Sequence, residues 1–177
     1  MKEGDRLMWI AALVVLILIA AWVMISYNRL VSLRDKNEKA FLLMDTNLKR
    51  MHDIVPELVE TVKSHAVNER EALEKVVQAR SMAMSSENIK EMQFNEHMLS
   101  SAINSLLAAV EGYPEMKTDD AFVQLKMQLH NVENDISNSK RDYNELVKAF
   151  NIKIENPPFS MIAGIFGLSR YPYFMVD

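Results

Sequence analysis

The chain has a long uncharged stretch near its N-terminus and is amphipathic beyond it. From Leu7 to Ile25 there are 19 consecutive residues without a charge. At about 1.5 Å per residue, an α-helix of this length spans roughly 28 Å, which is close to the thickness of a bilayer's hydrocarbon core. Trp9 and Trp22 lie near the two ends of the stretch, and indole rings prefer the headgroup zone. The pattern therefore predicts a membrane-spanning helix over residues 7–25 that contacts membrane lipid.

A cleaved signal peptide is the competing interpretation of this stretch. The apolar region of such a signal normally has about 7–15 residues and is followed by small residues at a cleavage site. Here Ser26 is followed by Tyr27, Asn28 and Arg29, so the sequence has no A-x-A pattern. We therefore expect a retained anchor, with residues 1–26 forming a short N-tail and the membrane helix.

Beyond the anchor, residues recur on one helical face at spacings of three and four, the heptad pattern typical of coiled coils. This seam consists of Tyr27, Leu30, Arg34, Asn37, Phe41, Met44, Leu48, Met51, Val55, Leu58 and Val62. We expect the membrane helix to continue as a stalk and Pro56 to kink or break it, because proline lacks an N–H and clashes with the preceding turn. The seam from Tyr27 to Met51 is partly beyond the reach of helices joined by short turns. We therefore expect neighbouring copies of the chain to cover it.

Two polar residues, Arg34 and Asn37, interrupt this seam. Polar groups at seam positions cost stability unless they are paired, and they can set the register of packed helices. The partners that we expect for them lie on the last predicted helix and are Glu133, Asn134 and Asn144.

The same periodicity predicts three more helices, at about residues 57–84, 89–112 and 118–156. Capping and helix-stopping residues separate them. Each helix is striped rather than apolar all round, so each must bury one face against the others. The predicted fold class is therefore all-α. A single N-terminal transmembrane helix continues into a long antiparallel bundle of four main helices, which occupies residues 27–156.

Residues 157–177 form an apolar tail that lacks the striped pattern. Two interpretations are open. The tail either straps onto the bundle's own groove, or it docks on a neighbouring copy or on the membrane surface. For docking between copies, the candidate contact residues are the large apolar ones, Phe159, Ile162, Ile165, Phe166, Leu168, Tyr173 and Phe174.

Composition and motifs narrow the functional classes. The formal net charge is -4 without a dominant basic face, so nucleic acid is not an expected partner. The chain has no cysteine, which excludes disulfides, thiolate metal sites and cysteine nucleophiles. None of the four histidines follows a carboxylate by three residues, as the Glu-x-x-His motif of di-iron bundles requires. We therefore predict that the protein is not an enzyme and has no catalytic residues, cofactor or metal site.

Several segments resemble the LemA family. They are residues 27–31 (YNRLV), 50–63 (RMHDIVPELVETVK), 79–80 (AR), 109–114 (AVEGYP), 133–136 (ENDI), 141–144 (RDYN), 150–151 (FN) and the tail from 159 to 174. Their order and spacing cover nearly the whole chain. The resemblance implies a bacterial, membrane-anchored helical bundle without an established catalytic site.

Two functional classes follow from this resemblance. One is a non-enzymatic envelope scaffold that self-assembles into homo-oligomers, and the other is a regulatory adaptor of a membrane protease or signalling protein. Either would be a single-pass protein of the bacterial inner membrane. The resemblance favours an extracytoplasmic soluble domain, because some relatives carry a lipoprotein signal in place of the anchor. Two Lys/Arg residues precede the membrane helix and four follow it closely, which favours the cytoplasmic side. The side of the membrane thus stays open.

Overall fold

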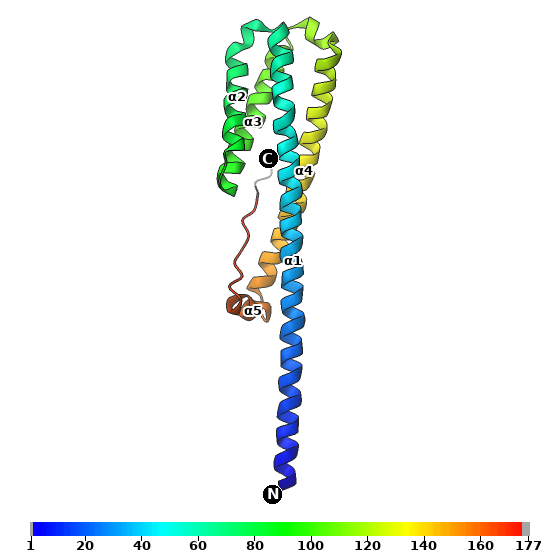
Figure 1. The fold of residues 1–177 in the computed structure, drawn as a ribbon, viewed down its shortest axis with the longest axis vertical. Helices are drawn as coiled ribbons and strands as arrows, with labels where there is room; N and C mark the ends of the chain where they lie inside the picture. The colour runs from blue at the N-terminus through cyan, green and yellow to red at the C-terminus, as the bar shows by residue number, and fades with distance from the viewer. Residues whose placement is uncertain (1, 175–177) are drawn as a thin grey trace. The chain divides into compact units, whose positions relative to one another are not determined.

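The computed structural model describes residues 2–174, and all regular elements among them are helical (Figure 1). In chain order they are α1 (Lys2–His65), the 3-10 turn η1 (Val67–Glu69), α2 (Arg70–Met84), α3 (Ile89–Val110), the 3-10 turn η2 (Pro114–Thr118), α4 (Asp120–Glu155) and α5 (Phe159–Ile165). The predicted all-α fold with four main helices is confirmed. The short α5 is an addition, because the sequence patterns assigned no helix to the tail.

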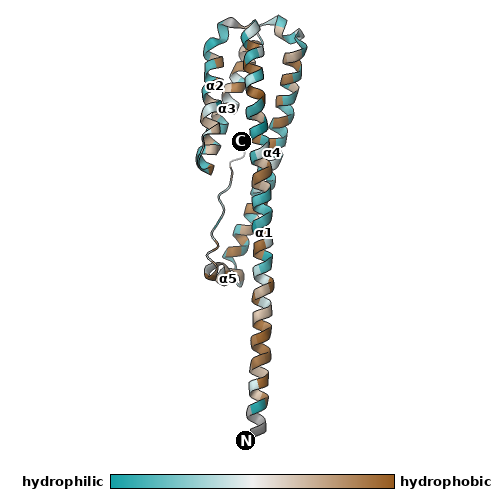
Figure 2. Cartoon of the chain, viewed as in Figure 1, coloured by the Kyte–Doolittle hydropathy of each residue, from teal (hydrophilic) through white to brown (hydrophobic). Residues whose placement is uncertain are grey.

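Helix α1 carries the predicted membrane span. Among the described residues it is the single helix that is long and apolar enough to cross a membrane, and none of its most apolar window is buried within the chain. Figure 2 shows this window as the brown stretch of α1 toward the N-terminus. Its length and composition fit the predicted span over residues 7–25, whose side chains would contact lipid rather than protein.

The predicted break at Pro56 is wrong, because α1 continues through this residue to His65. Proline has no N–H, so the carbonyl of His52, four residues earlier, loses its helical hydrogen bond. Arg80 of α2 replaces the missing donor: its Nε donates to the His52 carbonyl oxygen at 2.7 Å. A side chain from another helix therefore satisfies the carbonyl that Pro56 leaves without a partner.

The predicted second helix, residues 57–84, is divided between the end of α1 and the whole of α2. The chain leaves the helical conformation at Ala66, where φ is -120° and ψ is 66°. A tertiary hydrogen bond fixes the turn that follows, since the Tyr113 hydroxyl donates to Glu69 Oε1 at 2.9 Å. Neither glycine nor proline marks this turn, so the sequence pattern did not reveal it.

Contacts group the described chain into two units. The anchor unit contains residues 2–39 and 145–173, and the bundle unit contains residues 40–144 together with Phe174. In the bundle unit, the second part of α1 packs with α2, α3 and the first part of α4 (Figure 1). Its core is formed by the apolar stripes of these helices, including Leu58, Val62, Leu73, Val76, Leu99, Ile103, Leu106, Leu125, Leu129 and Val132.

The chain itself buries most of the apolar positions of the predicted seam on α1. Met44, Leu48 and Met51 are at most 2% exposed in a single copy. The expectation that neighbouring copies must cover these positions is therefore wrong. The prediction assumed that no other helix of the chain reaches the stalk, but α4 is long enough to do so. The Tyr143 ring of α4 contacts the Phe41 ring of α1, with ring centroids 5.8 Å apart.

Candidate functional surface around the tail

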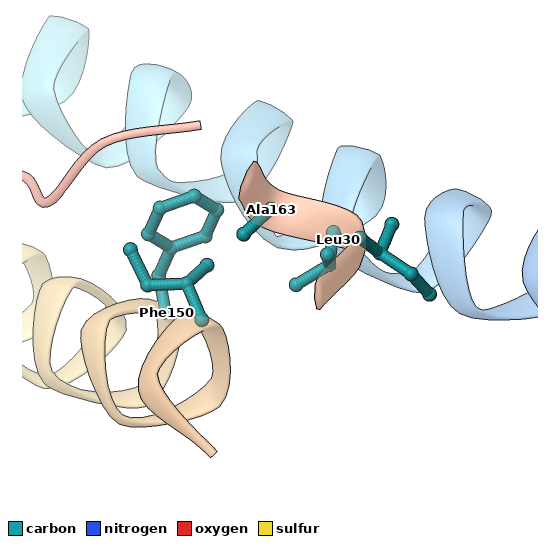
Figure 3. Close-up of a cluster of buried hydrophobic side chains, with 5 residues drawn as sticks. Leu30, Phe150 and Ala163 are labelled. Atoms are coloured by element: carbon teal, nitrogen blue, oxygen red, sulfur yellow. The ribbon is translucent and has the colours of Figure 1, made fainter. Parts of the chain in front are cut away.

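The tail folds onto the anchor unit through α5. This helix buries Ile162 and Ala163 against Leu30 of α1 and against Phe150 and Ile154 of α4 (Figure 3). A helix of seven residues is too short to be stable alone in water. Its helical conformation therefore depends on this burial, which fixes the position of α5 on the anchor unit.

The chain turns directly after α5. Gly167 has a φ of 64°, in the left-handed region that favours glycine. Just before the turn, the Phe166 ring lies 4.4 Å from the Tyr27 ring, centroid to centroid. Tyr27 follows the last uncharged residue of the span, Ile25, by two positions. The end of α5 is thus held beside the part of α1 that leaves the membrane span.

An asparagine holds the extended segment that follows. The Tyr171 backbone N–H donates to Asn151 Oδ1 at 2.9 Å, and Asn151 Nδ2 donates to the Tyr171 carbonyl oxygen at 2.9 Å. The Tyr171 ring also packs edge-on against Phe150, with centroids 5.2 Å apart. The Asn151 side chain is buried, so its amide pairs with the tail backbone as a neighbouring strand would.

The bundle unit holds the tail in the same way. The Phe174 N–H donates to Asn144 Oδ1 at 2.8 Å, and Asn144 Nδ2 donates to the Phe174 carbonyl oxygen at 2.6 Å. The Phe174 ring is 2% exposed and lies under the Lys140 ammonium group, 5.3 Å away. Asn144 and Asn151 are seven residues apart and therefore share one face of α4. These contacts match the interpretation of the tail as a strap on its own chain.

The seven candidate contact residues lie in different environments. Ile162 and Phe174 are buried within the chain, Phe159 and Leu168 are half-buried, and Ile165, Phe166 and Tyr173 are exposed. A further apolar residue of α5, Met161, is 72% exposed, and Ile165 is 78% exposed. We call Met161, Ile165 and Phe166 the α5 face. All three side chains are exposed, and the Phe166 ring also contacts the Tyr27 ring along one side.

The predicted partners of the polar seam residues are wrong. Arg34 is exposed and donates to Glu38 at 3.0 Å. Asn37 is fully buried, and neither its Nδ2 nor its Oδ1 has a hydrogen-bond partner in the described structure. No described hydrogen bond joins either residue to the three predicted partners, Glu133, Asn134 and Asn144.

The bundle unit also contains a buried polar pair that the patterns did not single out. His52 of α1 and Glu96 of α3 approach to 2.8 Å between Nε2 and Oε1, with side chains 8% and 3% exposed. Glu96 lies on the predicted apolar face of α3, between Met92 and Leu99. A carboxylate on an apolar helix face could have indicated this pair from the sequence, because a charged group that is buried needs a partner. The pair joins α1 to α3 inside the core.

The described residues contain no cluster of side chains that could hold a metal ion. Within the part of the chain that the structure describes, no group of three or more His, Asp or Glu residues lies together. The expectation of a protein without a metal site, cofactor or catalytic residue stays a prediction.

Comparison with known proteins agrees with the segment pattern. A family model described as the LemA family matches residues 40–177. Magnetosome protein MamQ 2 of Paramagnetospirillum magneticum is 33% identical over 73 residues, which cover 41% of this chain and 27% of that protein. Protein LemA of Metamycoplasma hominis is 28% identical over 128 residues, which cover 69% of this chain and 57% of that protein. The chain thus aligns with about a quarter of the first relative and somewhat more than half of the second.

Proposed function

The chain belongs to the LemA family of membrane-associated helical proteins, and we propose that it acts as a non-enzymatic scaffold that assembles with its own copies at the membrane. The α5 face is the observation that carries this proposal. Three large apolar side chains are exposed there, while the rest of the tail is fixed to the chain by burial and hydrogen bonds. Exposed apolar side chains that lie together on one surface can mark a site of contact with another protein.

The anchor strengthens a contact that is small by itself. Three side chains alone make a weak interface. A membrane span confines all copies to one plane and one orientation, which raises their effective concentration and makes a weak contact productive.

Light scattering of the full chain in detergent tests this proposal. The unaltered protein should have the mass of a homo-oligomer, and Ile165→Ser/Phe166→Ser should lower that mass. The matched control is Phe94→Ser/Met127→Ser, which removes one aromatic and one aliphatic side chain that are also exposed, in the bundle unit. An equal loss of mass in the control would remove the α5 face from the proposal. A monomeric unaltered protein would contradict the scaffold and leave an adaptor of another membrane protein as the better function.

We also propose that the soluble part lies on the extracytoplasmic side of a bacterial inner membrane. The family's lipoprotein-type relatives support this side, whereas the distribution of Lys and Arg around the span supports the other. Protease added to intact cells should degrade a tag placed after residue 177. A tag that survives until the cells are permeabilised would place the domain in the cytoplasm.

A further inference from the structure

The anchor unit contains a shallow basic groove next to the membrane span. It has a volume of about 450 Å³ and is lined by one face of α1, starting at Ile25, and by Lys153 of α4. Three cations line it, Arg29, Lys36 and Lys153, and its lining includes no carboxylate. The remaining lining residues are neutral, with Ser32 among them as a hydrogen-bond donor. The charges of the residues that line the groove therefore favour the binding of an anion.

The groove cations differ from the other cations on this stretch of α1. Arg34 pairs with Glu38 at 3.0 Å, and Lys39 pairs with Asp35 at 2.8 Å. In contrast, none of the ion pairs within the described structure uses a groove cation. The chain thus neutralises the neighbouring cations and leaves the charge of the groove uncompensated.

Packing holds one of the three cations at the groove. The Lys153 ammonium group lies 5.0 Å from the centre of the Phe159 ring, and this cation–π contact fixes a side chain that would otherwise be flexible. Phe159 begins α5, so the tail that straps onto the anchor unit also positions this charge. Two helices, α1 and α4, therefore line the groove, and α5 supports the lysine that α4 contributes.

If residues 7–25 span the bilayer, the end of the groove at Ile25 and Arg29 lies at the depth of lipid phosphates. Arg29 follows Ile25, the last residue of the predicted span, by four positions, which is about 6 Å along a helix. The headgroup layer on each side of the hydrocarbon core is about 5–8 Å thick. Lys36 lies seven residues, about 10 Å, farther along the helix than Arg29, and its long side chain leans back toward the bilayer because side chains of α1 tilt toward the helix N-terminus.

We propose that this groove binds the phosphate of an anionic membrane phospholipid. Three cations exceed the single charge of one phosphate diester, so a headgroup with no positive group of its own should bind better than a zwitterionic one. The ligand is a lipid rather than free phosphate, because the lining begins at an apolar residue of the span. This site does not depend on self-assembly through the α5 face.

Native mass spectrometry of the full chain in detergent tests the proposal, because it counts bound lipids and protein copies separately. The probes are dioleoyl phosphatidylglycerol and dioleoyl phosphatidylcholine, which share their acyl chains. We expect at least tenfold tighter binding of phosphatidylglycerol. At about fivefold for each cation, Arg29→Gln/Lys36→Gln should weaken that binding by roughly twenty-five-fold and Lys153→Gln by roughly fivefold.

The matched control is Arg34→Gln/Lys39→Gln, which removes the same charges from the same stretch of helix. It should change phosphatidylglycerol affinity by less than about twofold, since each of these cations is already paired. Equal binding of the two lipids, or an equal loss in the control, would overturn the proposal. Displacement of phosphatidylglycerol by millimolar inorganic phosphate would also overturn it, because the ligand would then be the free ion.

Discussion

The contact between Arg80 and the His52 carbonyl provides a quantitative test of how α1 passes through Pro56. Arg80→Met keeps most of the aliphatic stem and removes the donor, so the His52 carbonyl loses the 2.7 Å hydrogen bond that replaces the missing helical one. A hydrogen bond to a charged group contributes about 1.5–3 kcal/mol. We expect Arg80→Met to lower the free energy of unfolding by about 2 kcal/mol on that basis.

The second substitution, Pro56→Ala, returns an N–H to the helix. Pro56 is exposed, so alanine there leaves no cavity in the core. The new N–H can donate to the His52 carbonyl, and Arg80→Met should then cost less than about 1 kcal/mol. The difference between the two backgrounds is the coupling energy of a double-mutant cycle, and we expect it to exceed about 1 kcal/mol.

Urea unfolding of the full chain in detergent, followed by circular dichroism, measures all four variants of the cycle. Arg70→Met is the control, because Arg70 forms an exposed pair with Glu74 and its loss should change stability by less than about 0.5 kcal/mol. An equal cost of Arg80→Met in both backgrounds would refute the reasoning. The contact between Arg80 and His52 would then be incidental to the passage of α1 through Pro56.

Three further predictions concern single side chains. Asn151→Ala removes two hydrogen bonds worth about 1 kcal/mol each, so trypsin should cut after Arg170 about thirtyfold faster. Mass spectrometry of the fragments measures this rate, and a similar increase in Asn134→Ala, an exposed site on α4, would contradict it. Asn37→Leu should raise the free energy of unfolding by about 1–2 kcal/mol, because it replaces buried polar atoms that lack partners; a loss in urea unfolding would show that Asn37 has a partner. Burial raises the pKa of Glu133, with His130 partly opposing, so the folded state holds the proton more tightly than the unfolded chain does. Glu133→Gln should therefore stabilise the protein at neutral pH, and the gain should shrink as the pH falls and the carboxyl becomes protonated; a gain that is constant with pH would count against this assignment.

The sequence predicted the elements well where periodicity determines them. The uncharged stretch and the stripes on α3 and α4 follow from the spacing of apolar residues, and the helix ends near Gly112 and Asn156 follow from residues that stop helices. The end of α1 could not be predicted in this way. Local sequence rules predict a break at Pro56, but Arg80 of α2 donates a hydrogen bond to the carbonyl that the proline leaves without a partner. The turn at Ala66 depends on tertiary contacts instead.

The tail could be predicted only in part. Its apolar residues marked it as a segment that is buried somewhere, and the structure shows that Ile162 and Phe174 are buried within the chain. The sites that hold it are Asn144 and Asn151, whose side chains bind backbone groups rather than partner side chains. Backbone groups are present at every residue, so a sequence pattern carries no signal of which ones an asparagine will bind.

Cross-linking in the membrane tests the proposed self-assembly most directly. The chain has no cysteine, so one introduced thiol is the sole site for a bismaleimide reagent. Ile165→Cys places that thiol on the α5 face, and Met127→Cys places it at an exposed position of the bundle unit. Membranes that contain the first variant should yield cross-linked dimers, and membranes that contain the second should yield monomers. Monomers from Ile165→Cys, or equal dimer yields from the two variants, would contradict assembly through the α5 face.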